Sequence, residues 1–182
     1  MTYYVPPINL LGKGCLQDAA APIKAMGCKK ALISTDKFLT GNGTVDKVAK
    51  MLESVGVEYV VYNEAKPNPT VKNVEDGLKV LQENGCDFVV SVGGGSPQDC
   101  GKAIAVLATN GGSIKDYEGV NKSARKSLPI VAITTTAGTS AEVTINYVIT
   151  DTANKRKFVA VDPHDIPIVA FVDPDLTDTQ PR

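Results

Sequence analysis

The chain has 182 residues, of which 43% are apolar and 21% charged, a composition typical of one globular domain or two small ones and not of a disordered protein. Its 19 basic and 20 acidic side chains leave a net charge of −1, which disfavours a general nucleic-acid-binding protein. No apolar run approaches the ~20 residues of a membrane helix. The N-terminus also lacks the basic start and long apolar core of a secretory signal.

Short apolar runs alternate with amphipathic stretches over the first two thirds of the chain. The runs are rich in β-branched residues and are flanked by turn signals, which predicts buried strands at 31–34, 57–61, 88–92 and 130–133. Between them, apolar residues recur at helical spacing in 45–55, 71–81 and 104–108. This alternation predicts a Rossmann-like α/β fold, with a mostly parallel sheet and helices on both faces.

The last third of the chain has a different pattern. Strand candidates at 144–150, 158–161 and 168–172 follow one another without a long helix between them. The polar turn at 151–156 predicts a C-terminal β-hairpin added to the sheet. The polar, proline-containing end at 177–182 resembles a linker, so we expect the chain to be a fragment of a longer protein.

Three consecutive glycines at 93–95 follow one predicted strand and open a helix. Ser96 is expected to cap this helix, with Pro97 at its first position and Asp99 three residues after the cap. Free amides at the helix end, together with the helix dipole, would bind an anion. A tight, well-capped turn is the alternative. Because three glycines reduce stability without improving packing, we favour a phosphate site.

Asp36 ends the first predicted strand, well before the glycines. The usual dinucleotide fingerprint places G-x-G-x-x-G after the first strand and an acidic residue about 20 positions later, so this order differs from it. A carboxylate at a strand end could bind both hydroxyls of an adenosine ribose and repel a 2′-phosphate. The alternative is that Asp36 only caps a helix or forms part of a turn. Its position in the sequence, taken alone, favours this alternative.

Two further polar segments follow predicted strands. The threonine-rich stretch 134–139 lies where ligands bind in open α/β sheets, and its hydroxyls and amides could hold a pyrophosphate or a ribose. The alternative is an ordinary threonine-rich turn. The segment 66–69 is a rigid loop in which Asn68 could reach an adenine edge, although asparagine between two prolines commonly forms a turn.

The histidine and cysteine content limits the chemistry of this chain. With the single histidine His164, the chain alone cannot build a metal site with two or three imidazole ligands. The four cysteines, none of them in a C-x-x-C pair, are expected to be reduced thiols of a cytoplasmic protein; they are Cys15, Cys28, Cys86 and Cys100.

Taken together, these motifs resemble the iron-containing (group III) alcohol dehydrogenase family. The resemblance covers essentially the whole chain and is carried by 34–37, 67–69, 93–99, and 135–139 with Glu142. Gln98 and the stretches 141–151, 157–159 and 161–167 look most similar to members acting on lactaldehyde or 1,2-propanediol.

The resemblance implies that residues 1–182 form the N-terminal dinucleotide-binding domain of an enzyme about twice as long. The all-helical domain that carries the metal ligands, one aspartate and three histidines, would be absent. The whole enzyme would oxidise small alcohols or diols, or reduce the aldehydes, with NAD(H) rather than NADP(H) and with Fe²⁺ or Zn²⁺. The isolated chain is therefore expected to be inactive.

The resemblance also assigns roles by position. Asp36 would bind the adenosine ribose and favour NAD, and Asn68 would lie near the adenine or its ribose. The pyrophosphate would lie at Gly94, Gly95 and Ser96, with Asp99 in the first helical turn. The remaining positions would form the opposite wall and the nicotinamide end: Thr135, Thr136, Thr139, Tyr147, Val148 and Lys157. For Lys157, an exposed basic run is the alternative.

Two alternative functions are consistent with the same motifs. The chain could be a stand-alone nucleotide-binding or interaction module, or part of a sugar-phosphate lyase or synthase of the dehydroquinate synthase type. We expect a dinucleotide and a small alcohol or aldehyde as ligands, and neither nucleic acid nor membrane as a partner. The apolar N-terminal run 2–11 could pair as an edge strand, which predicts a homodimer or a larger assembly.

Overall fold

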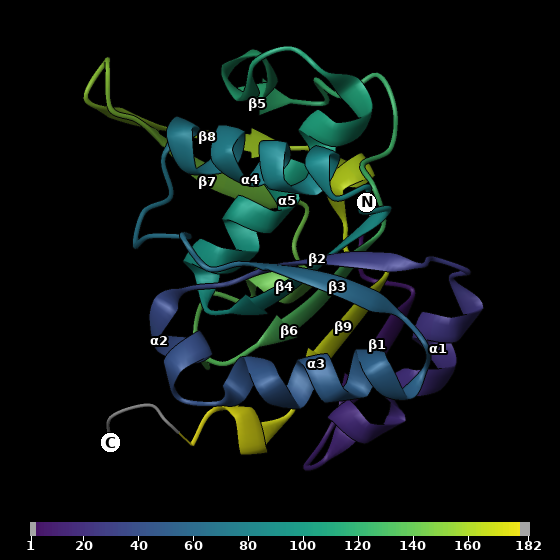
Figure 1. Cartoon of the computed structure of the whole chain (residues 1–182). Helices are drawn as coiled ribbons and strands as arrows, with labels where there is room; N and C mark the ends of the chain where they lie inside the picture. The colour runs from purple at the N-terminus through teal and green to yellow at the C-terminus, as the bar shows by residue number, and fades with distance from the viewer. Residues whose placement is uncertain (1–2, 179–182) are drawn as a thin grey trace.

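In the computed structural model, which describes residues 3–178, six parallel strands form the main sheet (Figure 1). The strand order is β1-β9-β6-β4-β2-β3, and every neighbouring pair is parallel, as the sequence predicts. The strands are β1 (Ile8–Leu11), β2 (Lys30–Ser34), β3 (Glu58–Tyr62), β4 (Phe88–Gly93), β6 (Ile130–Thr134) and β9 (Val169–Val172). The part of the expected linker at 179–182 lies outside the described residues.

Helices cover both faces of this sheet (Figure 1). On one face lie α1 (Ala20–Ala25), α3 (Thr44–Ser54) and the short 3-10 helix η1 (Cys15–Ala19). On the other lie α4 (Val71–Glu83) and α5 (Gly95–Asn110). The remaining short helices lie in connections: α2 (Lys37–Gly41), η2 (Ile114–Tyr117), η3 (Ala141–Val143), η4 (Pro163–Asp165) and η5 (Pro174–Leu176).

Side chains of the buried strands alternate between two cores. In β2, Ala31 and Ile33 pack in the core under α3, whereas Leu32 packs in the core under α4 and α5. Strand β4 follows the same pattern, with Val90 in the first core and Val89 in the second. Because successive strand residues point to opposite faces, a continuous apolar run is needed to fill both cores.

The expected hairpin forms, but it is not added to the main sheet. Strands β7 (Asn146–Asp151) and β8 (Arg156–Val161) pair antiparallel and join β5 (Gly119–Val120) in a separate three-stranded sheet. Every second residue of β7 is buried, whereas β4 is buried along its whole length. A strand with one buried face suits a sheet that α5 covers on one side only. It could not serve as a central strand of the main sheet, because such a strand is buried on both faces. The third candidate strand, β9, takes that place between β1 and β6.

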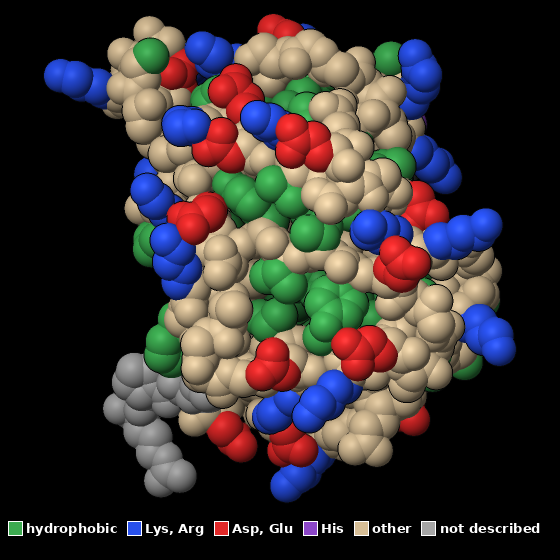
Figure 2. Space-filling view, in the orientation of Figure 1, with side chains coloured by type: hydrophobic (Ala, Val, Ile, Leu, Met, Phe, Trp, Pro, Cys, Tyr) green, Lys and Arg blue, Asp and Glu red, His purple; other side chains and the backbone are tan. Residues whose placement is uncertain are grey.

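The opposite edge of the main sheet is β3, whose side chains are partly exposed. Figure 2 shows the molecule from the same side as Figure 1, with hydrophobic side chains in the middle of this surface and charged side chains above and below them. Over residues 3–178, the helices are too short or too polar for any of them to cross a bilayer.

Candidate functional site

A cavity of about 490 Å³ opens at the carboxyl ends of four strands of the main sheet. Strand β2 lies between β3 and β4, so the chain winds to one side of β2 and then returns to the other. Ligands bind at such a reversal in open α/β sheets. The lining residues come from the ends of β2, β3, β4 and β6: Asp36, Lys37, Phe38, Leu39, Asn63, Glu64, Ala65, Lys66, Pro67, Gly94, Gly95, Ser96, Pro97, Thr135 and Thr136.

The glycine loop forms the floor of the cavity. Gly93 has a φ of 145°, and a Cβ there would lie 2.6 Å from Cγ of Pro97, so only glycine fits. Helix α5 begins at Gly95 with Gly94 in the cap position, and no side chain of the described residues caps it. The first amides of a helix lack acceptors within it, and the dipole makes this end positive. The loop can therefore bind an anion.

The start of α5 differs from the sequence expectation. Because the helix begins one residue before Ser96, Ser96 is not its cap and Asp99 lies beyond the first turn. Pro97 occupies the third helical position, which it can do because amides of the first turn have no helical acceptor to lose. The Ser96 hydroxyl accepts instead from the Asn68 amide at 3.2 Å.

The threonine-rich loop packs directly against the glycines. A Cβ at Gly94 would lie 3.1 Å from both Cγ2 and Oγ1 of Thr136, and one at Gly95 would lie 3.0 Å from Cγ2 of Thr139. The Thr135 amide donates to the Gly93 carbonyl at 3.2 Å, which joins the two loops. Thr135 and Thr136 line the cavity, while Thr139 supports the loop from outside the lining.

Gln98 holds the two loops together, a role that the sequence analysis missed. Its side chain is fully buried, and its amide nitrogen donates to the carbonyls of Ile133 at 3.0 Å and Gly93 at 3.4 Å. It therefore links the start of α5 to both β4 and β6. Ser96 and Asp99 lie close to Gln98 in the sequence, so its polarity gave no signal that it is buried.

Asp36 both caps a helix and lines the cavity. Its carboxylate Oδ1 accepts the Leu39 amide at 2.9 Å at the start of α2, which fits the capping alternative. The same side chain faces the cavity beside Phe38, whose side chain is 61% exposed. The two interpretations of Asp36 are therefore compatible, because a carboxylate accepts several hydrogen bonds.

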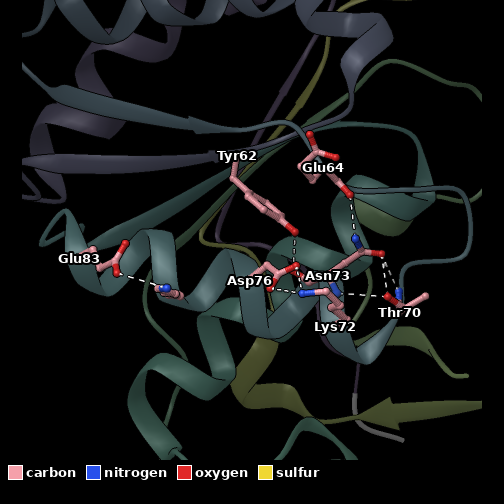
Figure 3. A network of polar contacts seen from close by, with 8 residues as sticks. Tyr62, Glu64, Thr70, Lys72, Asn73, Asp76 and Glu83 are labelled. Atoms are coloured by element: carbon pink, nitrogen blue, oxygen red, sulfur yellow. Dashed lines mark hydrogen bonds and ion pairs between the residues drawn. The ribbon is translucent and has the colours of Figure 1, made fainter. Parts of the chain in front are cut away.

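A polar network holds the wall formed by residues 63–67 (Figure 3). Thr70 and Asn73 form a capping box at the start of α4. The Asn73 side chain donates to the Glu64 carbonyl at 2.9 Å, and the Tyr62 hydroxyl donates to the Asn73 carbonyl at 2.7 Å. Glu64 also pairs with Lys37 at 2.8 Å. This wall is therefore anchored to both α4 and α2.

Asn68 and Lys157 meet each other next to the cavity. Asn68 has a left-handed φ of 57°, and the Lys157 ammonium donates to its Oδ1 at 2.7 Å. The Thr150 amide donates to the Pro69 carbonyl at 2.8 Å. The 67–69 loop therefore connects the start of α5 to the hairpin. Asn68 and Lys157 both lie outside the set of residues that line the cavity.

The remaining candidate residues lie where α5 meets β7. The Val148 amide donates to Oδ2 of Asp99 at 3.2 Å, and burial raises the pKa of this carboxyl to about 6. Tyr147 is fully buried in the second core, where burial raises the pKa of its hydroxyl. A cofactor contact through the Tyr147 side chain does not fit this position, because the ring is covered by core residues.

Within the described range, His, Cys, Asp and Glu side chains nowhere gather in a group of three or more that could hold a metal ion. His164, the only histidine of the sequence, lies in η4 beside Asp162, with 3.3 Å between its Nδ1 and the carboxylate.

Comparison with known proteins gives a consistent result. A family model described as iron-containing alcohol dehydrogenase matches residues 6–174. Lactaldehyde reductase of Escherichia coli K12 is 47% identical over 172 residues, which are 93% of this chain and 45% of that protein. A crystal structure of 1,3-propanediol oxidoreductase is 42% identical, with a TM-score of 0.96 over 99% of this chain and 47% of the other.

A second structure, sulfoacetaldehyde reductase from Bifidobacterium kashiwanohense in complex with NAD⁺, is 34% identical. Its TM-score is 0.88 over 100% of this chain and 48% of that one. The chain thus spans about half the length of the relatives it matches.

Proposed function

Because the chain belongs to the iron-containing alcohol dehydrogenase family, we propose that it is the dinucleotide-binding part of a metal-dependent NAD(H)-linked alcohol dehydrogenase or aldehyde reductase. The substrates would be small alcohols or diols of the lactaldehyde and 1,2-propanediol type. One observation carries the proposal. The N-terminus of α5, which no side chain among residues 3–178 caps, follows Gly93 and Gly94 and opens into the cavity that Asp36 borders.

The residues present fit a dinucleotide. The two positions closest to the threonine loop, Gly94 and Gly95, have no room for a Cβ without displacing Thr136 or Thr139. Their amides and that of Ser96 would hold the pyrophosphate, and Asp36 would accept from the hydroxyls of a ribose. The exposed Phe38 ring and Pro67 border the same space. Bound NAD would supply the hydride acceptor, and the chain would orient it and shield it from water.

The metal of the family does not fit the described part of this chain, which offers no suitable ligand cluster. A second candidate function is therefore a nucleotide-binding module without redox activity. The two functions predict the same binding and differ in turnover. We expect no oxidation of 1,2-propanediol and no reduction of lactaldehyde by the isolated chain with Fe²⁺ or Zn²⁺. Metal-dependent turnover by this chain alone would contradict the assignment.

Calorimetry with NADH and NADPH tests the binding proposal. We expect tighter binding of NADH, because the Asp36 carboxylate would repel a 2′-phosphate. Asp36→Gly should narrow this preference at least tenfold, or ~1.4 kcal/mol. Asp46→Gly is a matched control at an exposed position of α3 that is not among the residues lining the cavity. An unchanged preference in Asp36→Gly would leave this residue as a helix cap alone.

Association and location are also proposed. Strand β1 is an edge of the main sheet, and Leu11 is 70% exposed there, so we propose pairing with a second copy. Leu11→Lys should lower the mass that light scattering measures across a concentration series. If the unaltered protein keeps the mass of a single chain at every concentration, pairing is contradicted.

The location of the protein is a separate proposal. The four free cysteines support a reducing compartment such as the cytoplasm.

A further inference from the structure

Lys102 places a positive charge inside the protein. It lies in the middle of α5, and its side chain is fully buried. The ammonium group donates to the carbonyls of Ala141 and Thr144, both at 2.6 Å, and to the Thr144 hydroxyl and the Asn146 carbonyl, both at 3.1 Å. All four acceptors lie in one segment, the connection from the threonine loop to β7.

This connection, residues 139–148, contacts one face of α5 at three points. Thr139 approaches Gly95, residues 141–146 bind Lys102, and the Val148 amide binds Asp99. Positions 95, 99 and 102 are spaced i, i+4 and i+7, so they share a helix face. The backbone of the connection is therefore aligned along the first two turns of the helix whose N-terminus forms the anion site.

The arrangement is specific to a charged donor with several protons. An ammonium group has three protons and can serve several carbonyls, whereas an apolar side chain of the same length would leave buried carbonyls without donors. Burial lowers the pKa of Lys102 to about 8, and the nearby Asp99 carboxyl opposes this shift by favouring the charged ammonium. Buried charges often contribute little net stability, and their best-attested use is to fix one arrangement.

The connection also continues the wall of the cavity. Thr135 and Thr136 line the cavity at the end of β6, and residues 139–148 follow them in the chain. Strand β6 lies on one side of β4, and β2, which leads to Asp36, lies on the other. If one nucleoside lies at Asp36 and the pyrophosphate at the start of α5, the other nucleoside must extend past Thr136 toward this connection.

We propose that Lys102 is a positioning residue, which holds the 139–148 connection against α5 and thereby shapes the site for the half of a dinucleotide beyond its pyrophosphate. This inference rests on the proposed function. It predicts that Lys102 matters for the second nucleoside and not for the ADP portion, because the Asp36 side of the cavity is held independently by α2 and by the network at Asn73.

The test compares NADH with ADP by calorimetry at pH 7. Lys102→Met should weaken NADH binding at least about tenfold and change ADP binding less than about twofold. Leu107→Ala is the control, because Leu107 is also buried on α5 but contacts the second core. It should lower the thermal midpoint without changing the ratio of the two affinities. Amide exchange at Val148 should accelerate in Lys102→Met and not in the control.

The outcomes are separable. Equal weakening of NADH and ADP, or no weakening of either, would overturn the role of Lys102. Failure of the unaltered protein to bind either ligand would instead contradict the proposed function. If Lys102→Met does not fold, Thr144→Val removes one of the four acceptors. It should then weaken NADH binding about threefold with ADP unchanged, and no effect on NADH would likewise overturn the inference.

Discussion

Replacing Gly95 with alanine tests how closely the threonine loop packs on the glycine loop. The new methyl group would lie 3.0 Å from Cγ2 of Thr139 and 3.4 Å from its Oγ1. Overpacking of this kind costs ~1–3 kcal/mol. Alanine also restricts the unfolded chain, which contributes ~0.4–1 kcal/mol in the opposite direction. We therefore expect Gly95→Ala to lower the free energy of unfolding by about 1 kcal/mol.

Thr139→Ser provides the compensating change. Serine lacks Cγ2, so the closest remaining neighbours of the new methyl group are Oγ1 at 3.4 Å and Cβ at 3.5 Å, which are ordinary contacts. In this background Gly95→Ala should raise the free energy of unfolding by ~0.4–1 kcal/mol, since only the unfolded-state effect remains. Urea unfolding of the four proteins in this cycle measures the coupling.

A change of sign between the two backgrounds is the expected result. NADH binding should follow the same pattern, weakening in Gly95→Ala and recovering in the double variant, because Thr139 then no longer has to move. Equal effects of Gly95→Ala in both backgrounds would refute the close packing of the two loops.

Two further predictions concern buried polar groups. Asp165 is fully buried with both carboxylate oxygens unpaired among residues 3–178, and burial together with Asp162 raises its pKa to about 8. Because the folded state holds this proton more tightly, its contribution to stability falls as the pH rises from about 4 to 8. Asp165→Asn should therefore stabilise the protein by at least ~1.4 kcal/mol in urea at pH 8.5 and have little effect near pH 4, and a pH-independent difference would exclude this titration. Thr70→Ala removes the capping box with Asn73 and should lower the stability measured by thermal unfolding by ~1 kcal/mol. It should also weaken ADP binding, because the network at Asn73 holds the 63–67 wall. The control Lys72→Ala, at an exposed ion pair with Asp76, should change neither stability nor binding.

The strands and the location of the site could be predicted from local sequence. Buried parallel strands need apolar residues on both faces, so the runs ending near Ser34, Val92 and Ile133 identify the sheet directly. Polar residues that follow such strands lie at one edge of the sheet. That rule places Asp36, the glycines and the threonines at the same edge, and the structure brings Asp36, Gly94, Gly95, Thr135 and Thr136 into one cavity.

Details that depend on contacts distant in sequence could not be predicted in this way. Ser96, Pro97 and Asp99 match a capping pattern, but the Ser96 hydroxyl instead accepts from Asn68, which is 28 residues away. The polar turn at 151–156 predicts the hairpin of β7 and β8, but the prediction that it joins the main sheet was wrong, because the hairpin pairs with β5 in a separate sheet. Lys102 offered one overlooked signal: a lone lysine within an otherwise apolar part of α5, where nearly every neighbour is buried.

Amide chemical shifts recorded while NADH is added would test the central proposal most directly. A dinucleotide at the start of α5 should shift the amides of Gly94, Gly95 and Ser96 most strongly, followed by those near Asp36 and Thr136. A second cavity of about 510 Å³, lined by α3 residues including Lys47 and Lys50, provides the internal comparison and should show no change. Shifts concentrated at this second cavity, with the glycine loop unaffected at saturating NADH, would contradict the proposal.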